Sequence, residues 1–192
     1  MGRPKGYCRN ELLQQAMNAF WEHGYDSTSL SELVDCTGVN KVSLYREFGD
    51  KRGLYLACLD RYQNCVVAKF MEPLLAPEAG LQTLRDWFAS ASKGQCDSGY
   101  RTCMMANATV EGVEDPEVQR RTREHHLQMQ AAFATVIRSA QARGEVDATH
   151  DADVLSGTLM AVAIGGSVIA RSHQDPEACR RAVFKVLDLL AA

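Results

Sequence analysis

The chain of 192 residues has seven cysteines but no CxxC pair, which leaves a zinc ribbon or a thioredoxin-type redox motif without support. Aromatic residues make up only 7% of the chain and its five prolines are scattered, which argues against a β-sandwich and a disordered tail. The net charge of −3 excludes a histone-like protein that binds polyanions over its whole surface. Because the first residues also lack an apolar signal core, the sequence predicts a cytoplasmic protein with free thiols.

Long hydrophobic runs are equally scarce. Residues 154–170 form the one stretch of that length without a charged side chain, and it falls just short of the ~18 residues at which a spanning helix becomes a candidate. Several glycine and serine residues interrupt it. The sequence therefore predicts a buried helix here and no membrane partner.

What the sequence does contain is helical periodicity, and no alternating strand pattern of useful length accompanies it. Leu13, Ala16, Met17 and Phe20 lie on one face of a first helix. Prolines near residues 71–78 indicate a boundary between a smaller amino-terminal part and a larger one. The prediction is an all-α protein with helices over about 9–23, 30–37, 41–48, 51–70, 79–94, 102–113, 116–143, 151–171 and 176–191.

The segment Ser29–Phe48 has the proportions of a helix-turn-helix, with two helices of about two turns joined through a turn that contains Gly38. Ser29 and Glu32 have the spacing of a capping box, and Asn40 is a suitable N-cap for the second helix. The inward side of that second helix is assigned to Val42, Leu44 or Tyr45, and Phe48.

The outward side of the same helix carries short donors, a phenol and cations, which suit base edges and phosphates. The residues are Lys41, Ser43, Tyr45 and Arg46. Lys51 and Arg52 follow at the start of the next helix, where the free N–H groups favour a phosphate. From this spacing alone, an ordinary helical hairpin with a solvated face remains an equal alternative.

Fixed spacings over about the first 60 residues resemble the amino-terminal signature of the TetR family of repressors. The matching positions are Ala16, Phe20, Trp21, Gly24, Tyr25, Thr28, Ser29, Leu30, Leu33, Val34, Gly38, Val39, Asn40, Lys41, Ser43, Leu44, Tyr45, Phe48, Gly49, Asp50, Lys51 and Leu54. The resemblance implies a helix-turn-helix DNA-binding domain (residues 1–50), a linking helix (51–70) and an effector-binding and dimerisation domain (71–192). It also implies a homodimer formed through the last two helices, and a near-palindromic double-stranded DNA operator.

Carried over position by position, the residues that match places facing DNA are Thr28, Lys41, Ser43, Tyr45, Arg46 and Lys51. Arg3 lies in Gly2-Arg3-Pro4-Lys5, which resembles a basic arm laid in a minor groove; a solvated tail is the alternative. The sequence departs from the family at Val42, where a small residue is frequent, and at Gly53, where an acidic residue is frequent.

In the carboxy-terminal part, Trp87, Met104 and Phe133, with other Met and Phe residues, are candidates to line an apolar effector pocket. Plain hydrophobic core is the alternative for the same residues. Gly157, Ala161 and Gly165 form a small-residue ridge at i, i+4 and i+8, which we assign to packing between subunits.

Cys103 is the candidate reactive thiol, because it follows Thr102, a suitable N-cap, and Arg101 is nearby. A helix amino terminus and a cation both lower a thiol pKa. The stretch from Cys103 to Glu111 also resembles repressors of the N-ethylmaleimide reductase gene, which sense electrophiles through such a cysteine. Cys96, expected in a loop, is a candidate resolving thiol. A purely structural Cys103 is the alternative.

Other cysteines are predicted to be inert core residues, namely Cys36, Cys58, Cys65 and Cys179. A metal site formed by Cys96, Cys103 and His125 or His126 has no known ligand spacing, so the sequence predicts no metal and no cofactor. The prediction is a transcriptional regulator, and most simply a repressor released by a small molecule or by thiol modification. A cytoplasmic thiol enzyme using Cys103 is the rival hypothesis, and no histidine at a characteristic distance supports it.

Overall fold

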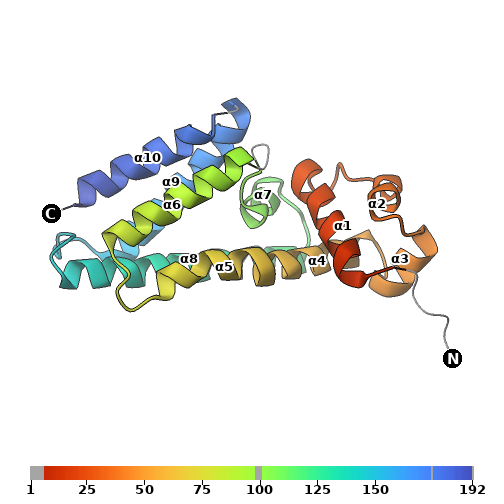
Figure 1. Ribbon diagram of the computed structural model, residues 1–192, viewed down its shortest axis with the longest axis horizontal. Helices are drawn as coiled ribbons and strands as arrows, with labels where there is room; N and C mark the ends of the chain where they lie inside the picture. Colours follow the sequence, from red (N-terminus) through yellow and green to blue (C-terminus); the bar gives the residue numbers. More distant parts are fainter. Residues whose placement is uncertain (1–6, 98–100, 174, 192) are drawn as a thin grey trace.

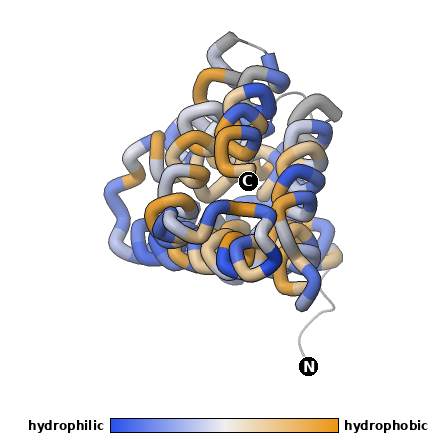
Figure 2. Tube along the Cα trace, turned by 90° about the vertical axis from the view of Figure 1, so that its left-hand side faces the viewer, coloured by the Kyte–Doolittle hydropathy of each residue, from blue (hydrophilic) through white to orange (hydrophobic). Residues whose placement is uncertain are grey.

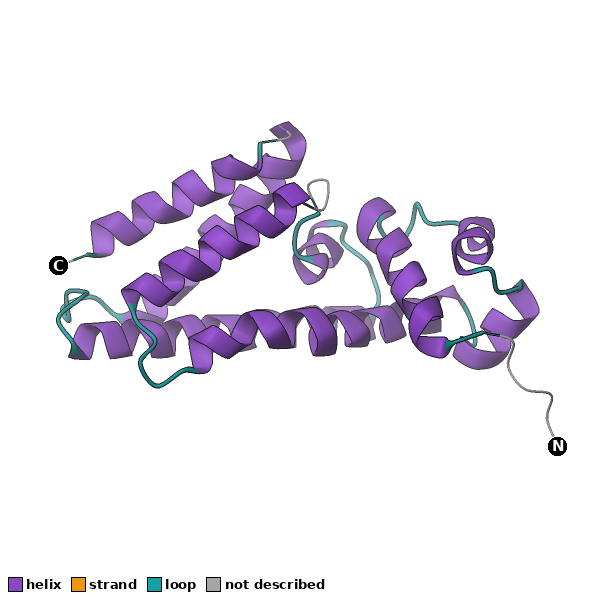
Figure 3. Ribbon diagram, in the orientation of Figure 1, coloured by secondary structure: helices purple, strands orange, loops and turns teal. Residues whose placement is uncertain are grey.

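A computed structural model describes residues 7–97, 101–173 and 175–191. Over these ranges the chain is helical, with no β-strand beyond one isolated bridge between Val146 and Ala191 (Figure 3). The all-α prediction is confirmed. The helices are α1 (Arg9–His23), α2 (Leu30–Thr37), α3 (Lys41–Phe48), α4 (Lys51–Tyr62), the π-helix η1 (Gln63–Val67), α5 (Ala68–Met71), the 3₁₀-helix η2 (Glu72–Leu75), α6 (Leu81–Asp97), α7 (Met104–Val110), α8 (Pro116–Ala142), α9 (Ala152–His173) and α10 (Pro176–Leu190).

Helices α1, α2 and α3 form one end of the elongated molecule, and α6, α9 and α10 form the other (Figure 1). The continuous run from α4 through α5 leads from the first group into the second, and the long α8 lies along it. The short helix α7 lies between the two groups. Helices α7, α4 and α1 therefore lie between the carboxy-terminal helices and α3.

The short amino-terminal helices begin at side chains that cap them. Ser29 Oγ accepts a hydrogen bond from Glu32 N at 3.1 Å, and Asn40 Oδ1 accepts one from Ser43 N at 3.0 Å. Asp50 caps α4 in the same way through Gly53 N at 2.7 Å. Each cap satisfies a backbone donor that a helix start leaves free.

The turn between α2 and α3 depends on Gly38, whose φ of +65° lies in the left-handed region. An L side chain rarely adopts that conformation, so glycine is the residue that lets α3 cross α2. The capping box is only half formed, because the carboxylate of Glu32 lies 3.1 Å from His23 Nε2 at the end of α1. This contact between Glu32 and His23 links α2 to α1.

One hydrophobic cluster runs through the described residues, from Leu12 in α1 to Leu190 in α10. Hydrophobic and hydrophilic residues follow one another along the visible helical turns (Figure 2), as expected for helices that bury one face. Tyr55 of α4 packs edge to face against Phe20 of α1, with ring centroids 4.9 Å apart. The amino-terminal helices are thus packed onto the helix that leads to the rest of the protein.

Three features of the carboxy-terminal helices differ from the sequence prediction. The helix expected over 102–113 is only α7, residues 104–110, and the one expected to end near 94 continues to Asp97. The helix expected to be buried, α9, is mostly not: only 22% of the window Ala152–Ile169 is buried within the chain. Periodicity alone could not distinguish burial inside one chain from an apolar face that a single chain leaves open.

Candidate functional site

The outer face of α3 presents most of the side chains predicted to contact DNA. Lys41, Tyr45 and Arg46 are exposed and Ser43 is half-buried, while Leu44 on the opposite side is only 2% exposed and anchors the helix to the core. The Lys41 ammonium lies 5.3 Å from the centre of the Tyr45 ring. This cation–π contact orders two long side chains on one face.

Val42 corrects the assignment made from the sequence. The pattern of apolar residues assigns it to the inward side of this helix, yet 76% of it is exposed. An exposed β-branched residue has no stabilising role on a two-turn helix, whereas an apolar side chain on a groove-reading face can contact a thymine methyl group. Val42 therefore joins the candidate contact surface.

Lys51 begins α4 and is held near the end of α1. Its Nζ donates to the backbone carbonyl of Asp26 at 3.4 Å and lies 4.6 Å from the centre of the Tyr25 ring. Lys51 is also the first residue of α4, and the first-turn N–H groups of a helix favour an anion. The sequence predicts that Lys51 belongs to this surface, and its position is compatible with a phosphate contact.

Thr28 is a second correction. Its side chain is fully buried, with 0% exposed, and its Oγ1 donates to the carbonyl of Gly24 at 2.6 Å. The hydroxyl satisfies a backbone acceptor where α1 ends, so it has no access to a ligand on the surface. The role that the resemblance implied for Thr28 gives way to a structural one.

Two residues predicted to be functional cannot be placed in full. Arg3 lies outside the described residues, and so does the side chain of Cys96. The backbone of Cys96 belongs to the last turn of α6 and not to a loop, which corrects the position expected for it.

A cavity of about 230 Å³ lies where the carboxy-terminal helices meet α1 and α4. Its walls come from α1, α4, η1, α5, α6, α7, α8 and α9. The lining residues include Trp21, Tyr62, Val66, Val67, Phe70, Trp87, Phe88, Ala91, Arg101, Thr102, Cys103, Ala106, His125, His126, Met129, Phe133, Met160, Ala163, Ile164 and Ser167. An apolar cavity with a few convergent polar groups is typical of a small-molecule site.

An aromatic cluster forms one wall of this cavity. Trp87 contacts Phe88 and Phe133 edge to face, with ring centroids 4.9 and 5.3 Å apart. The indole N–H of Trp87 donates to the carbonyl of Phe70 at 2.6 Å, which fixes the ring. Trp87 and Phe133, both predicted as effector-pocket residues, thus line one cavity. Met104, predicted beside them, is buried but lies in the core and is not among the lining residues.

The polar end of the cavity holds Cys103 and two histidines of α8. Cys103 Sγ lies 3.6 Å from His125 Nε2, and His125 Nδ1 lies 3.0 Å from Gln63 Oε1. Burial lowers the pKa of His125 to about 4 and also lowers the pKa of His126, so both rings are neutral near pH 7. His126 Nε2 is buried with no protein hydrogen-bond partner, and that nitrogen is available to a ligand.

Cys103 differs from the reactive thiol that the sequence predicted. It is itself the N-cap of α7, and Thr102 Oγ1 donates to Asn107 Oδ1 at 2.6 Å. Burial raises the pKa of the Cys103 thiol, and the hydrogen bonds from the α7 backbone and Tyr62 only partly offset this. Desolvation therefore outweighs the helix dipole. Among the described residues, no group of three or more His, Cys, Asp or Glu side chains is arranged to hold a metal.

The thiols predicted to be inert core residues fit that description to different degrees. Cys58 is fully buried and Cys36 is half-buried, and burial raises the pKa of both. Cys65 on η1 is exposed, which corrects the prediction that it packs in the core. The π-helical turn breaks the periodicity on which that prediction rested. The side chain of Cys179 lies outside the described residues.

Four contacts join α1, the turn after it and α4 to residues 101–115, the segment that contains Cys103. Trp21 Nε1 donates to the carbonyl of Thr102, and Arg101 Nη2 lies 2.9 Å from Glu22 Oε2. Tyr25 N donates to the carboxylate of Glu111 at 3.2 Å. Arg52 of α4 forms an ion pair with Asp115, the N-cap of α8.

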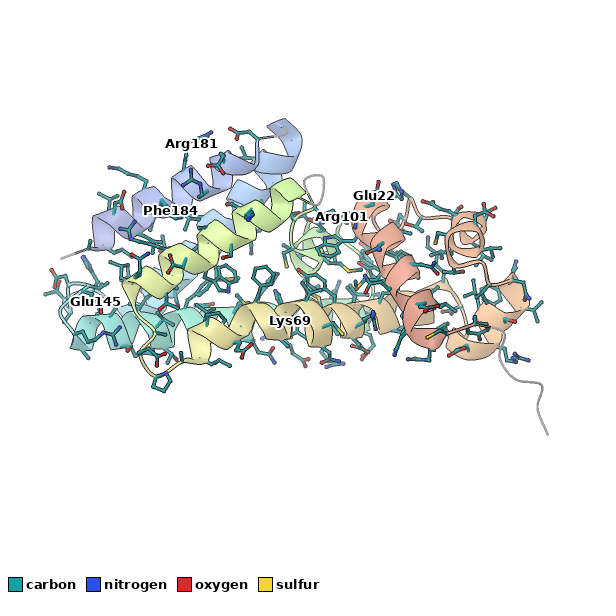
Figure 4. All side chains as sticks on the ribbon, viewed as in Figure 1. Glu22, Lys69, Arg101, Glu145, Arg181 and Phe184 are labelled. Atoms are coloured by element: carbon teal, nitrogen blue, oxygen red, sulfur yellow. The ribbon has the colours of Figure 1, made fainter. Side chains whose placement is uncertain are left out.

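Sequence reasoning missed Trp21 and Arg101 as lining residues. In the sequence, Trp21 stands out only as part of a family signature, and Arg101 only as a neighbour of the thiol. No periodicity indicates such a role, because Trp21 reaches the cavity from a helix 81 residues away from Thr102. Figure 4 labels Arg101 and Glu22 at this junction between α1 and the segment before α7.

Comparison with known proteins agrees with this geometry. A model of bacterial regulatory proteins of the tetR family matches residues 12–58, and a tetracyclin repressor-like C-terminal domain matches residues 80–186. The transcriptional repressor ComR of Escherichia coli K12 is 33% identical over 179 residues, which cover 92% of this chain and 85% of that protein. These matches cover both groups of helices.

Solved structures share the complete fold. A cysteine-substituted CifR, solved with 26-bp double-strand operator DNA, is 25% identical with a TM-score of 0.84, and the match covers 98% of this chain and 100% of that chain. Reduced NemR of Escherichia coli is 17% identical with a TM-score of 0.78, and the match covers 95% of this chain and 96% of that chain. The chain therefore belongs to the TetR family and is a DNA-binding, helix-turn-helix transcriptional regulator.

Proposed function

We propose that the protein is a homodimeric repressor that acts in the cytoplasm, binds a near-palindromic operator through α3, and leaves it when a small molecule occupies the cavity. The observation that carries this proposal is the cavity itself, whose polar end is built from the same segment that contacts α1. Residues 1–50 would form the DNA-binding domain, 51–70 the link and 71–192 the effector and dimerisation domain.

The proposed DNA surface consists of Lys41, Val42, Ser43, Tyr45 and Arg46 on α3, with Lys51 beside them. Its cations suit phosphates, and its hydroxyl and methyl groups suit base edges. In a dimer, two copies of α3 would enter successive major grooves about 34–36 Å apart, which requires an operator of approximate twofold symmetry.

The proposed dimer surface is the open face of α9. Ala161 and Gly165 are exposed, and no atom of the described chain lies within 4 Å of a Cβ built on Gly165. Exposed Val154, Val168 and Ile169 continue this face. An apolar helix face that one chain leaves uncovered is typical of a subunit interface.

Regulation accounts for the cavity better than catalysis. A thiol catalyst needs a thiolate, yet burial raises the pKa of Cys103, and the neighbouring His125, with a pKa of about 4, is a weak base. The raised pKa of Cys103 and the lowered pKa of His125 both support a polar end that binds a ligand and does not react with it. Turnover of an electrophilic substrate in proportion to enzyme concentration would contradict this.

Release by thiol modification is the second candidate. One observation favours it: the Cys103 sulfur lines the cavity, where it lies 3.6 Å from His125 Nε2. An electrophile that enters the cavity would meet this thiol before it meets those elsewhere in the chain. Because the thiolate fraction is low, we expect the exposed Cys65 to react faster than Cys103 with a hydrophilic electrophile.

The first test is to select bound fragments from a genomic library and footprint the protected site. We expect a near-palindrome whose affinity falls with salt, and Lys51→Ala should reduce the salt slope by about one unit, because the variant would neutralise one phosphate fewer. Equal operator affinity and slope for Lys51→Ala, Arg46→Ala and the parent would remove α3 and α4 from the interface.

The second test concerns the dimer. Light scattering should report a dimer for the parent and a monomer for Gly165→Phe, because the ring would hold two α9 helices apart. Leu75→Phe, at another exposed apolar position outside α9, is the matched control and should remain dimeric. A monomeric parent would contradict the proposed assembly.

A further inference from the structure

The described residues that line the cavity carry positive charge but no negative charge, a feature that the proposed function does not require. Among the lining residues that the structure describes, Arg101 is the only permanently charged side chain, and no Asp or Glu is present. The remaining polar groups are neutral hydroxyls, a thiol and the two histidines. The cavity is therefore an apolar volume with one positive charge at its end.

Burial keeps the two histidines from adding charge of their own. The pKa of His125 falls to about 4 and that of His126 is lowered as well. Their nitrogens can donate or accept hydrogen bonds, but a ligand with a positive group would find no carboxylate among the described lining residues. A negatively charged group would find one opposite permanent charge among these lining residues, the Arg101 guanidinium.

Arg101 has a carboxylate partner that lies outside the cavity. Its Nη2 is 2.9 Å from Glu22 Oε2, with 27% of the Arg101 side chain and 55% of the Glu22 side chain exposed. Glu22 is not a lining residue. A partly solvated ion pair of this kind contributes little to stability, so a second carboxylate that approaches from the drier, cavity side can replace it.

We propose that the cavity binds an apolar monocarboxylate, and that its carboxylate takes Arg101 from Glu22 and so transmits occupancy to α1. The proposal rests on the proposed effector function and names the ligand class. The volume of the cavity limits the size of the ligand: it is about 230 Å³, compared with roughly 150 Å³ for a cavity that holds benzene. A short aliphatic or phenyl-substituted acid fits this volume.

The path to α1 is short. Arg101 precedes Thr102, whose carbonyl accepts the hydrogen bond of the Trp21 indole, and the Arg101 guanidinium lies 6.0 Å from the centre of that ring. Trp21 and Glu22 are adjacent near the end of α1. Displacement of Arg101 therefore changes two contacts of the same stretch of α1, which packs directly on α2 and α4.

The experiment uses pairs of ligands that differ only in charge: 3-phenylpropionate and its amide, and octanoate and its amide. The chain has two tryptophans, and both line the cavity, so intrinsic fluorescence reports occupancy directly. We expect each acid to bind the parent about tenfold more tightly than its amide, as one charge-assisted hydrogen-bonded pair warrants.

Two variants and a matched control distinguish the role of Arg101 from that of Glu22. Arg101→Gln should abolish the preference for the acid, and the affinity that remains for the amide shows that the variant is folded. Glu22→Gln removes the competing carboxylate, so acid affinity should rise several-fold. Arg85→Gln breaks an ion pair with Asp188 of similar exposure (21% and 55%) outside the cavity, and should change neither affinity.

Operator release is measured with the same ligands. We expect the acids to lower operator affinity of the parent at least about fivefold, within the usual range of coupling between sites, and to lower it less in Glu22→Gln, where the bridge is already broken. Equal affinity for acid and amide, or no binding by either, overturns the ligand class. Tight acid binding without operator release instead overturns the effector function and leaves the charge preference standing.

Discussion

The two ends of the molecule use their surfaces in opposite ways. On α3 the exposed side chains are mostly polar, with Lys41, Tyr45 and Arg46 around one apolar Val42. On α9 many exposed side chains are apolar, and only 22% of its most hydrophobic window is buried. A polar exposed face suits nucleic acid and an apolar one suits a second protein surface.

A second difference concerns where the functional side chains lie relative to the core. The proposed DNA contacts stand on a folded scaffold and do not support it. The cavity, in contrast, is lined by core residues, such as Phe133 at 1% exposed. Mutations of the α3 contacts should therefore change DNA affinity without changing stability, whereas mutations of the buried cavity wall should change ligand affinity and stability together.

The largest effect is expected for Phe133→Ala. The ring packs against Trp87 and Phe88, and its removal should lower the free energy of unfolding by about 3–5 kcal/mol. Urea denaturation measures the change, with ligand affinity read from tryptophan fluorescence. A fall in ligand affinity with unchanged stability would show that this wall is not part of the core.

Much of the amino-terminal part could be predicted from the sequence because its signals are local. Ser29, Asn40 and Asp50 act on backbone groups three residues away, so a short window contains both partners. The error at Val42 has the same origin: which side of a two-turn helix faces inward depends on how α3 lies against α4, and two turns give too few apolar positions to determine it.

The cavity could be predicted only in part because its residues come from distant segments. Trp87 and Phe133 stand out in the sequence by their size and hydrophobicity. Arg101 and Trp21 were missed, since only the docking of α1 brings them together. Cys103 shows the same limit for electrostatics, because the sequence reveals the helix start and the adjacent cation but not the burial that raises the thiol pKa.

Thr28→Val tests the one predicted DNA contact of the described amino-terminal residues that is fully buried. The substitution keeps the shape and removes the donor to the Gly24 carbonyl, so the free energy of unfolding should fall by about 1–2 kcal/mol. Thr28→Ser, which keeps the hydroxyl, should recover most of it. Operator affinity of the folded Thr28→Val protein should match the parent; a drop of about tenfold, or ~1.4 kcal/mol, would restore the contact role implied by the resemblance.

The pH dependence of stability should reflect the buried histidine. His125 has a folded pKa of about 4 against ~6.5 when unfolded, so the unfolded chain takes up the proton first as pH falls. Its contribution is therefore complete above about pH 6.5 and is lost as pH falls towards about 4, by up to about 1.4 kcal/mol per pH unit.

Denaturation between about pH 7 and pH 5.5 isolates this histidine from the carboxylates, which titrate lower. We expect the parent to lose about 1 kcal/mol more than His125→Gln over this interval. His150→Gln, on an exposed loop, accounts for the removal of one histidine and should follow the parent. Parallel curves for the parent and His125→Gln would mean that His125 is solvated in solution.

The smallest change in stability, and the sharpest separation from function, is expected on α3. Val42→Ala and Ser43→Ala alter exposed or half-buried side chains, so each should change the free energy of unfolding by no more than about 0.5 kcal/mol. If these groups contact base edges, each should cost about 1–3 kcal/mol at the preferred operator and little on unrelated DNA. Competition between the two DNAs measures this difference. A reduction that is uniform across sequences would place these side chains on phosphates, and reduced stability without reduced affinity would erase the distinction between the two ends of the molecule.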